Sequence, residues 1–147
     1  DYANQGLGIR MRLFNFSGAR PTKAANLIVS PSPSGLIAVD DTSGEVAWCT
    51  EMETTSYTRH NSLAVSPAAF AGGHFFTGTK DGRLLCVSPQ TGEVVWEERV
   101  NGPIKHEPVV AKGRIYVCSG RKLYCLDTED PKIDGWPMWG GAITRNK

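Results

Sequence analysis

Short apolar runs separated by turn residues recur along this chain. The runs 73–78 (GHFFTG) and 83–87 (RLLCV) are rich in aromatic, aliphatic and β-branched residues, and the turn residues Lys80, Asp81 and Gly82 lie between them. Asp-Gly between two such runs favours a hairpin, because glycine accepts positive φ without a Cβ clash. The pattern predicts two paired antiparallel strands.

A second turn follows this hairpin, and an extended segment comes after it. Residues 88–92 (SPQTG) combine a proline that presets φ with a glycine suited to a left-handed conformation, and 93–96 (EVVW) resume the extended pattern. The same arrangement occurs earlier, as 40–44 (DDTSG) followed by 45–48 (EVAW). The repeated unit is therefore strand, turn, strand, turn, strand.

The spacing of the tryptophans gives the period of the repeat. Trp48 and Trp96 are 48 positions apart, and a worn third copy ends 40 positions later at Trp136. This range brackets the four-stranded blade of a β-propeller. No stretch has apolar residues at helical spacing over three turns, and 16 Gly and 9 Pro punctuate the chain, so we expect an all-β protein.

The repeat resembles that of the quinoprotein-type β-propellers, a family named after pyrroloquinoline quinone (PQQ). Its consensus has a Pro-led strand, a Gly turn, an apolar strand and then Ala-x-Asp-x-x-Thr-Gly-x-x-x-Trp. The segment 38–48 keeps Ala38, Gly44 and Trp48, and the segment 86–96 has Cys86 in place of Ala and Ser88 in place of Asp. The resemblance implies a partial β-propeller of about three four-stranded antiparallel blades.

The same resemblance implies structural roles for a set of residues in these segments. In the family, the tryptophan docks between blades, flat against a small residue and a glycine peptide of a neighbouring blade, where an aromatic plane buries a large area. Carried over position by position, the structural docking residues are Ala38, Gly44, Trp48, Cys86, Gly92, Trp96 and Trp136. The third copy departs from the pattern, since 130–134 (DPKID) replaces the Thr-Gly turn.

We divide the chain into residues 1–25, a non-repeat segment that supplies at most one strand of the first blade, and residues 26–147, three blades with a closing segment. The stretch 136–146 (WPMWGGAITRN) is similar to a segment found near the end of such propellers, so we expect it to be the natural terminus. Three blades do not close a ring of the usual 4 to 8. The expected partners are therefore the remaining blades of a larger propeller, or a second copy of the chain.

The charge and hydropathy of the chain argue against two classes of partner, nucleic acids and membranes. The 16 Lys and Arg against 15 Asp and Glu make no basic field for nucleic acid. No run of 18 apolar residues occurs, so we expect no membrane insertion. Family resemblance favours a periplasmic or secreted location.

The four cysteines are expected to be free thiols. Cys86 and Cys125 share one repeat position where a small packing residue is preferred, and free Cys behaves as a small hydrophobe. Counting back from the hairpin turn pairs Cys118 with a position near Leu123 rather than with Cys125. That register argues against a disulfide between Cys118 and Cys125.

No catalytic, cofactor-binding or metal-binding residue is predicted. The chain has neither an adjacent Cys-Cys pair nor a Cys-x-x-Cys-His motif, and its acidic residues fall mostly in turns, where Asp caps its own backbone. The sequence favours a non-catalytic scaffold that binds proteins through the rim loops 51–61 and 98–106. The alternative is part of a PQQ-dependent alcohol or sugar dehydrogenase, with PQQ and Ca²⁺ held mostly by residues outside this chain.

Overall fold

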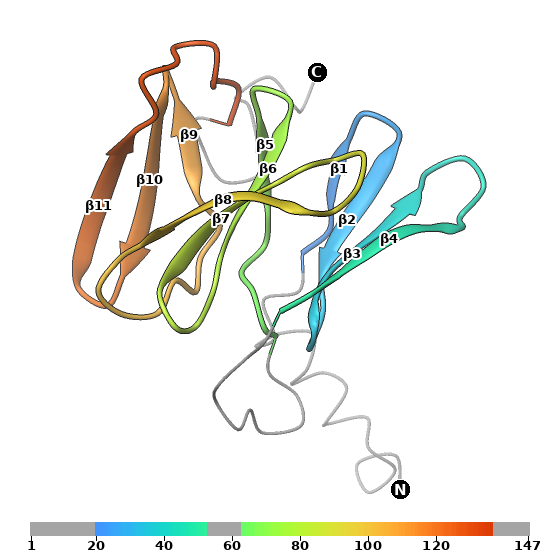
Figure 1. Ribbon diagram of the computed structural model, residues 1–147, viewed down its shortest axis with the longest axis horizontal. Coiled ribbons are helices and arrows are strands. Elements are labelled where there is room, and N and C mark those ends of the chain that lie inside the picture. The colour runs from blue at the N-terminus through green and yellow to red at the C-terminus, as the bar shows by residue number, and fades with distance from the viewer. Residues whose placement is uncertain (1–19, 53–62, 137–147) are drawn as a thin grey trace, which may run out of the picture.

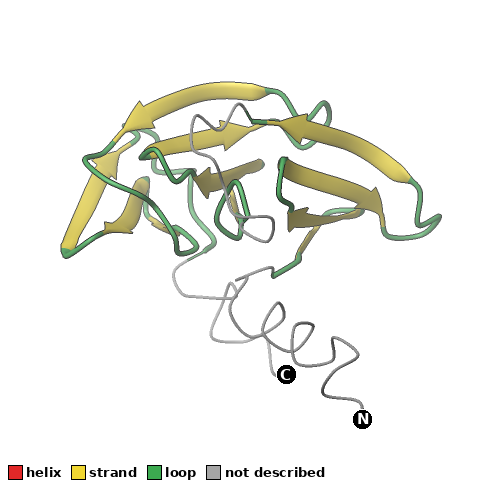
Figure 2. Cartoon of the chain, turned by 90° about the horizontal axis from the view of Figure 1, so that it is seen from below, coloured by secondary structure: helices red, strands yellow, loops and turns green. Residues whose placement is uncertain are grey.

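A computed structural model describes residues 20–52 and 63–136, and within them the chain forms three antiparallel sheets that fan out side by side (Figure 1). Figure 2 shows strands joined by loops throughout these ranges. The all-β, partial-propeller architecture expected from the repeats is thus confirmed. The segment 1–25 was predicted to supply at most one strand of the first blade; its residues 1–19 lie outside the described residues, and its residues Thr22–Ala24 form strand β1.

The strands follow one another in simple meanders. The first sheet has the order β1 (Thr22–Ala24), β2 (Leu27–Pro31), β3 (Gly35–Asp40) and β4 (Val46–Glu51). The second has β5 (Ala69–Ala71), β6 (His74–Gly78), β7 (Arg83–Val87) and β8 (Val94–Arg99). The third has β9 (Val109–Ala111), β10 (Arg114–Ser119) and β11 (Lys122–Asp127).

The turn before each outer strand is built in the same way in the first two sheets. Gly44 and Gly92 take φ values of 73° and 75°, and their amides donate to the carbonyls of Asp40 and Ser88 at 2.9 Å. Each turn is followed by a register shift in the ladder between the last two strands. The sequence repeat is therefore also a repeat of backbone geometry.

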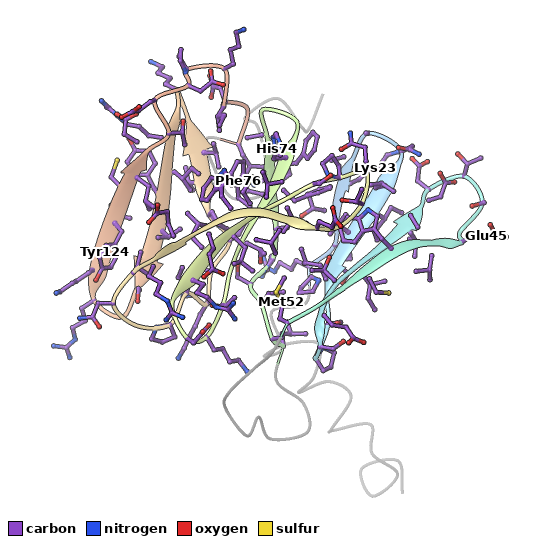
Figure 3. All side chains as sticks on the ribbon, in the orientation of Figure 1. Lys23, Glu45, Met52, His74, Phe76 and Tyr124 are labelled. Carbon is purple, nitrogen blue, oxygen red and sulfur yellow. The ribbon has the colours of Figure 1, made fainter. Side chains whose placement is uncertain are left out.

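Two apolar clusters join the sheets, and the second sheet contributes to both. Successive side chains of a strand point to opposite faces, so Phe75 enters the cluster shared with the first sheet and Phe76 the cluster shared with the third. Both rings are fully buried. Figure 3 labels Phe76 on the side of the second sheet that faces β9–β11. Because one strand feeds two interfaces, the second sheet holds the other two in place.

The first strands of the three sheets contact one another. β5 contacts both β1 and β9. The hydroxyl of Thr22 donates to the carbonyl of Ala68 at 2.6 Å across the first of these contacts. Thr22 also shows that the first sheet begins before residue 26.

The third repeat ends differently from the other two. Trp136 does not lie in an outer strand but forms a bridge with Val110 on the inner side of β9, with N···O distances of 2.7 and 3.0 Å. Among the described residues, β11 carries no strand on its outer edge. The expected fourth strand of this sheet is thus absent from residues 20–52 and 63–136.

The register of the last hairpin is the predicted one. Cys118 lies opposite Leu123, and Cys125 lies opposite Tyr116. All four cysteines are free in the structure. The two exposed thiols of this hairpin are therefore held in different cross-strand pairs.

Candidate functional site

The junction between the first and second sheets is closed by Trp48. Its Nε1 donates to the carbonyl of Pro89 at 2.8 Å, and its indole lies so close to Gly92 that an added Cβ would be 2.6 Å from Cε3. The hydroxyl of Thr50 donates to the carbonyl of Gly92. Trp48 is 8% exposed and meets the ring of Phe75 edge-on, with centroids 6.3 Å apart.

The junction between the second and third sheets is more open. Trp96 is half-buried and tilted against Phe76, with centroids 5.9 Å apart and 49° between the rings. No Thr-Gly turn follows β11, and the residues after Asp127 run on as TEDPKID. A cleft of about 420 Å³ remains there, lined by Trp96, Glu98, Leu126, Asp127 and Thr128.

The small residues of the motif lie opposite the tryptophan of their own sheet. Ala38 pairs with Trp48 across β3 and β4, and Cys86 pairs with Trp96 across β7 and β8. The neighbouring sheet contributes the glycine peptide instead. Burial raises the pKa of the Cys86 thiol to about 12, so the group stays protonated. Gly44, unlike Gly92, has open space where a Cβ would stand.

One face of the third sheet presents apolar side chains that the other described residues leave partly or largely exposed, beside the exposed ion pair of Arg114 and Asp127. The cross-strand register makes four of its positions equivalent to four positions that the second sheet buries under the third. Leu84 is 0% exposed, whereas its counterpart Leu123 is 67% exposed. The counterparts of Ala69, Phe76, Leu84 and Cys86 are Val109, Tyr116, Leu123 and Cys125. Each of these four is at least partly exposed.

The acidic turn residues serve their own backbone. Oδ1 of Asp40 accepts hydrogen bonds from the amides of Ser43 and Thr42 at 2.8 and 3.0 Å, and these bonds hold the pKa of that carboxyl below its usual value. The amide of Glu129 and the guanidinium of Arg114 lower the pKa of Asp127 in the same way. Across the described ranges, no group of three or more His, Cys, Asp or Glu is placed to hold a metal ion.

The two rim loops named from the sequence differ from each other. Most of the loop 51–61 lies outside the described residues. In the loop 98–106, Ile104 is buried and packs so tightly on Gly78 that an added Cβ would be 2.1 Å from Cγ2. That loop is partly a core element, which its sequence does not show. Residues 20–52 and 63–136 contain no helix long and apolar enough to span a membrane.

Comparison with known proteins identifies the repeat. A family model described as outer membrane protein assembly factor BamB matches residues 33–134. The quinohemoprotein alcohol dehydrogenase ADH IIB of Pseudomonas putida is 31% identical over 130 residues, which are 81% of this chain and 19% of that protein. BamB of Shewanella oneidensis is 30% identical over 86 residues, 58% of this chain and 21% of that protein.

Solved structures agree on the fold. BamB from Moraxella catarrhalis superposes with a TM-score of 0.58 at 21% identity, over 80% of this chain and 34% of that one. Quinohemoprotein alcohol dehydrogenase from Comamonas testosteroni gives 0.61 at 19% identity, over 79% and 21%. The chain spans about a fifth to a third of the relatives that it matches. It belongs to the PQQ-like β-propeller repeat family described as outer membrane protein assembly factor BamB.

Proposed function

We propose that this chain is a non-catalytic PQQ-like propeller module that acts as a protein-binding scaffold. The observation that carries the proposal is the uncovered apolar face of the third sheet, because its positions match those that the second sheet buries under its neighbour. Apolar side chains that lie together on an exposed surface are typical of an interaction site. The natural occupant is another unit of the same repeat, from the remaining blades or from a second copy.

The relatives support a protein partner and suggest where it is met. Several are named as factors in the assembly of outer membrane proteins. A chain with the same role would work on protein partners near that membrane. We therefore propose a periplasmic or secreted location.

The test is the solution mass of the full chain, measured by light scattering over a range of concentrations. We expect a dimer or larger species, because the open face offers the second copy the same kind of surface that joins the sheets within one chain. Leu123→Lys should shift the midpoint of association to at least tenfold higher concentration. Val46→Lys is the matched control, since Val46 is similarly exposed at 62% but lies on β4.

The outcomes are distinct from one another. A monomer at every concentration would contradict docking of a second copy and would leave the remaining blades as the occupant. Equal effects of the two lysine substitutions would contradict docking through this face. The docking positions Trp48 and Gly92 are untouched by either change. If the solution mass of Leu123→Lys falls while its far-ultraviolet circular dichroism is unchanged, the variant has lost association and not its fold.

A second candidate function is part of a PQQ-dependent alcohol or sugar dehydrogenase. Identity of 31% over most of this chain to a quinohemoprotein alcohol dehydrogenase favours it. The discriminating experiment adds PQQ and Ca²⁺ to the chain and follows the absorbance of the quinone. Saturable binding would move this candidate ahead of the scaffold, whereas an unchanged spectrum would leave the scaffold in front.

A further inference from the structure

The two sheet junctions are built from the same repeat but differ where their tryptophans dock. At the first junction, Thr50 stands two residues after Trp48 and donates to the carbonyl of Gly92. At the second, Glu98 stands two residues after Trp96, and no equivalent glycine follows β11. A surface that the first junction closes is therefore left as a cleft of about 420 Å³.

The lining of this cleft combines an aromatic plane with negative charge. Trp96 and Leu126 are half-buried and provide apolar walls. Asp127 accepts a hydrogen bond from the amide of Glu129 at 3.0 Å and pairs with Arg114 at 3.4 Å. The carboxylate of Glu98 has no ion-pair partner among the described residues. The carboxylate of Glu98 is therefore available to a ligand.

The surroundings reinforce that charge. The segment 127–134 that borders the cleft contains four acidic residues and one lysine, namely Asp127, Glu129, Asp130, Asp134 and Lys132. Even with Arg114 paired to Asp127, these side chains together carry a net negative charge, which favours a cation over an anion beside the cleft. The volume lies within the range of about 300–1,000 Å³ that small-ligand sites occupy.

We propose that this cleft binds an arginine side chain presented by a protein partner. A guanidinium is planar, stacks on the face of an indole and matches a carboxylate through two parallel hydrogen bonds. In the cleft, the guanidinium stacks on Trp96 and donates to Glu98, while its aliphatic stem lies along Leu126. The identity of the partner as a protein rests on the proposed scaffold function, whereas the recognition chemistry rests on the cleft alone.

The test is an NMR titration of the full chain, labelled with ¹⁵N at its tryptophans. N-acetyl-arginine methylamide is added as the ligand. The chain has four tryptophans, so four indole N–H signals are expected, and Trp96→Phe assigns the one of interest. We expect saturable movement of the Trp96 signal with arginine, and at least tenfold weaker binding of the uncharged citrulline analogue. Glu98→Gln should weaken arginine binding about tenfold.

Glu97→Gln is the matched control. Glu97 is the adjacent acidic residue on β8, points to the other face of the sheet and pairs with Arg83 at 3.3 Å, so the same loss of charge should leave the dissociation constant within twofold. Equal binding of citrulline and arginine, equal effects of the two glutamine substitutions, or no movement of the Trp96 signal would each overturn the proposal. Because the probe is a single amino acid, its failure is separate from any failure of the open face of β9–β11.

Discussion

Replacing Gly92 by alanine tests whether the indole of Trp48 docks on the glycine peptide. The added Cβ would lie 2.6 Å from Cε3 and 2.7 Å from Cδ2 of Trp48, and 2.8 Å from Oγ1 of Thr50. These separations are too short for non-bonded atoms, so the indole must move or the turn must open. Gly44 occupies the same turn position with nearly the same φ, and a Cβ added there would have nothing within 4 Å.

Gly92→Ala and Gly44→Ala therefore share one contribution to the loss of stability and differ in a second. A left-handed backbone costs an L-residue about 1–2 kcal/mol, and both alanines meet that cost. Overpacking adds about 1–3 kcal/mol, and only Gly92→Ala meets it. We expect Gly92→Ala to lower the free energy of unfolding by about 1–3 kcal/mol more than Gly44→Ala.

The assay is urea unfolding of the full chain, followed by circular dichroism and tryptophan fluorescence. Repeating Gly92→Ala in a Trp48→Ala background completes a double-mutant cycle, which isolates the contact between the two sites. In that background the excess cost of Gly92→Ala should largely disappear. Equal costs of Gly44→Ala and Gly92→Ala in the parent chain would refute the docking geometry.

Three further predictions concern buried residues of the molecule. Gly78→Ala should lower the free energy of unfolding by about 1–3 kcal/mol, because its Cβ would overlap Ile104. In an Ile104→Ala background, the same substitution should cost less. Additive effects of the two substitutions in the double variant would contradict the contact. Cys86 should react with a thiol reagent at pH 8 far more slowly than the exposed Cys49, Cys118 and Cys125. The measurement is the rate of reaction in variants that each keep a single cysteine. Since burial raises the pKa of Cys86 from 9.0 to about 12, the folded state holds this proton more tightly, so the Cys86 contribution to stability should fall as pH rises from about 9 to 12 and vanish in Cys86→Ala.

The features that the sequence determined by itself are those that depend on neighbouring residues in the chain. Strand alternation, the Asp-Gly hairpin at residues 81–82 and the glycine turns at Gly44 and Gly92 depend on residues close together in the chain, and each is found where the pattern predicts it. The register that separates Cys118 from Cys125 follows from the same counting. The spacing of the tryptophan motif is that of one propeller blade, and the resemblance of its residues to the PQQ-like consensus indicated the family.

Only the tertiary structure decided which sheet edges and faces are paired. Trp136 has the spacing of an outer-strand tryptophan, yet it pairs with Val110 on the inner side of β9, because the sequence DPKID cannot form the Thr-Gly turn that would lead into an outer strand. Leu84 and Leu123 are equivalent in sequence, but a neighbouring sheet covers only the first. Burial and junction geometry depend on contacts between residues about 40 or more positions apart, such as Trp48 with Pro89, which no local pattern encodes.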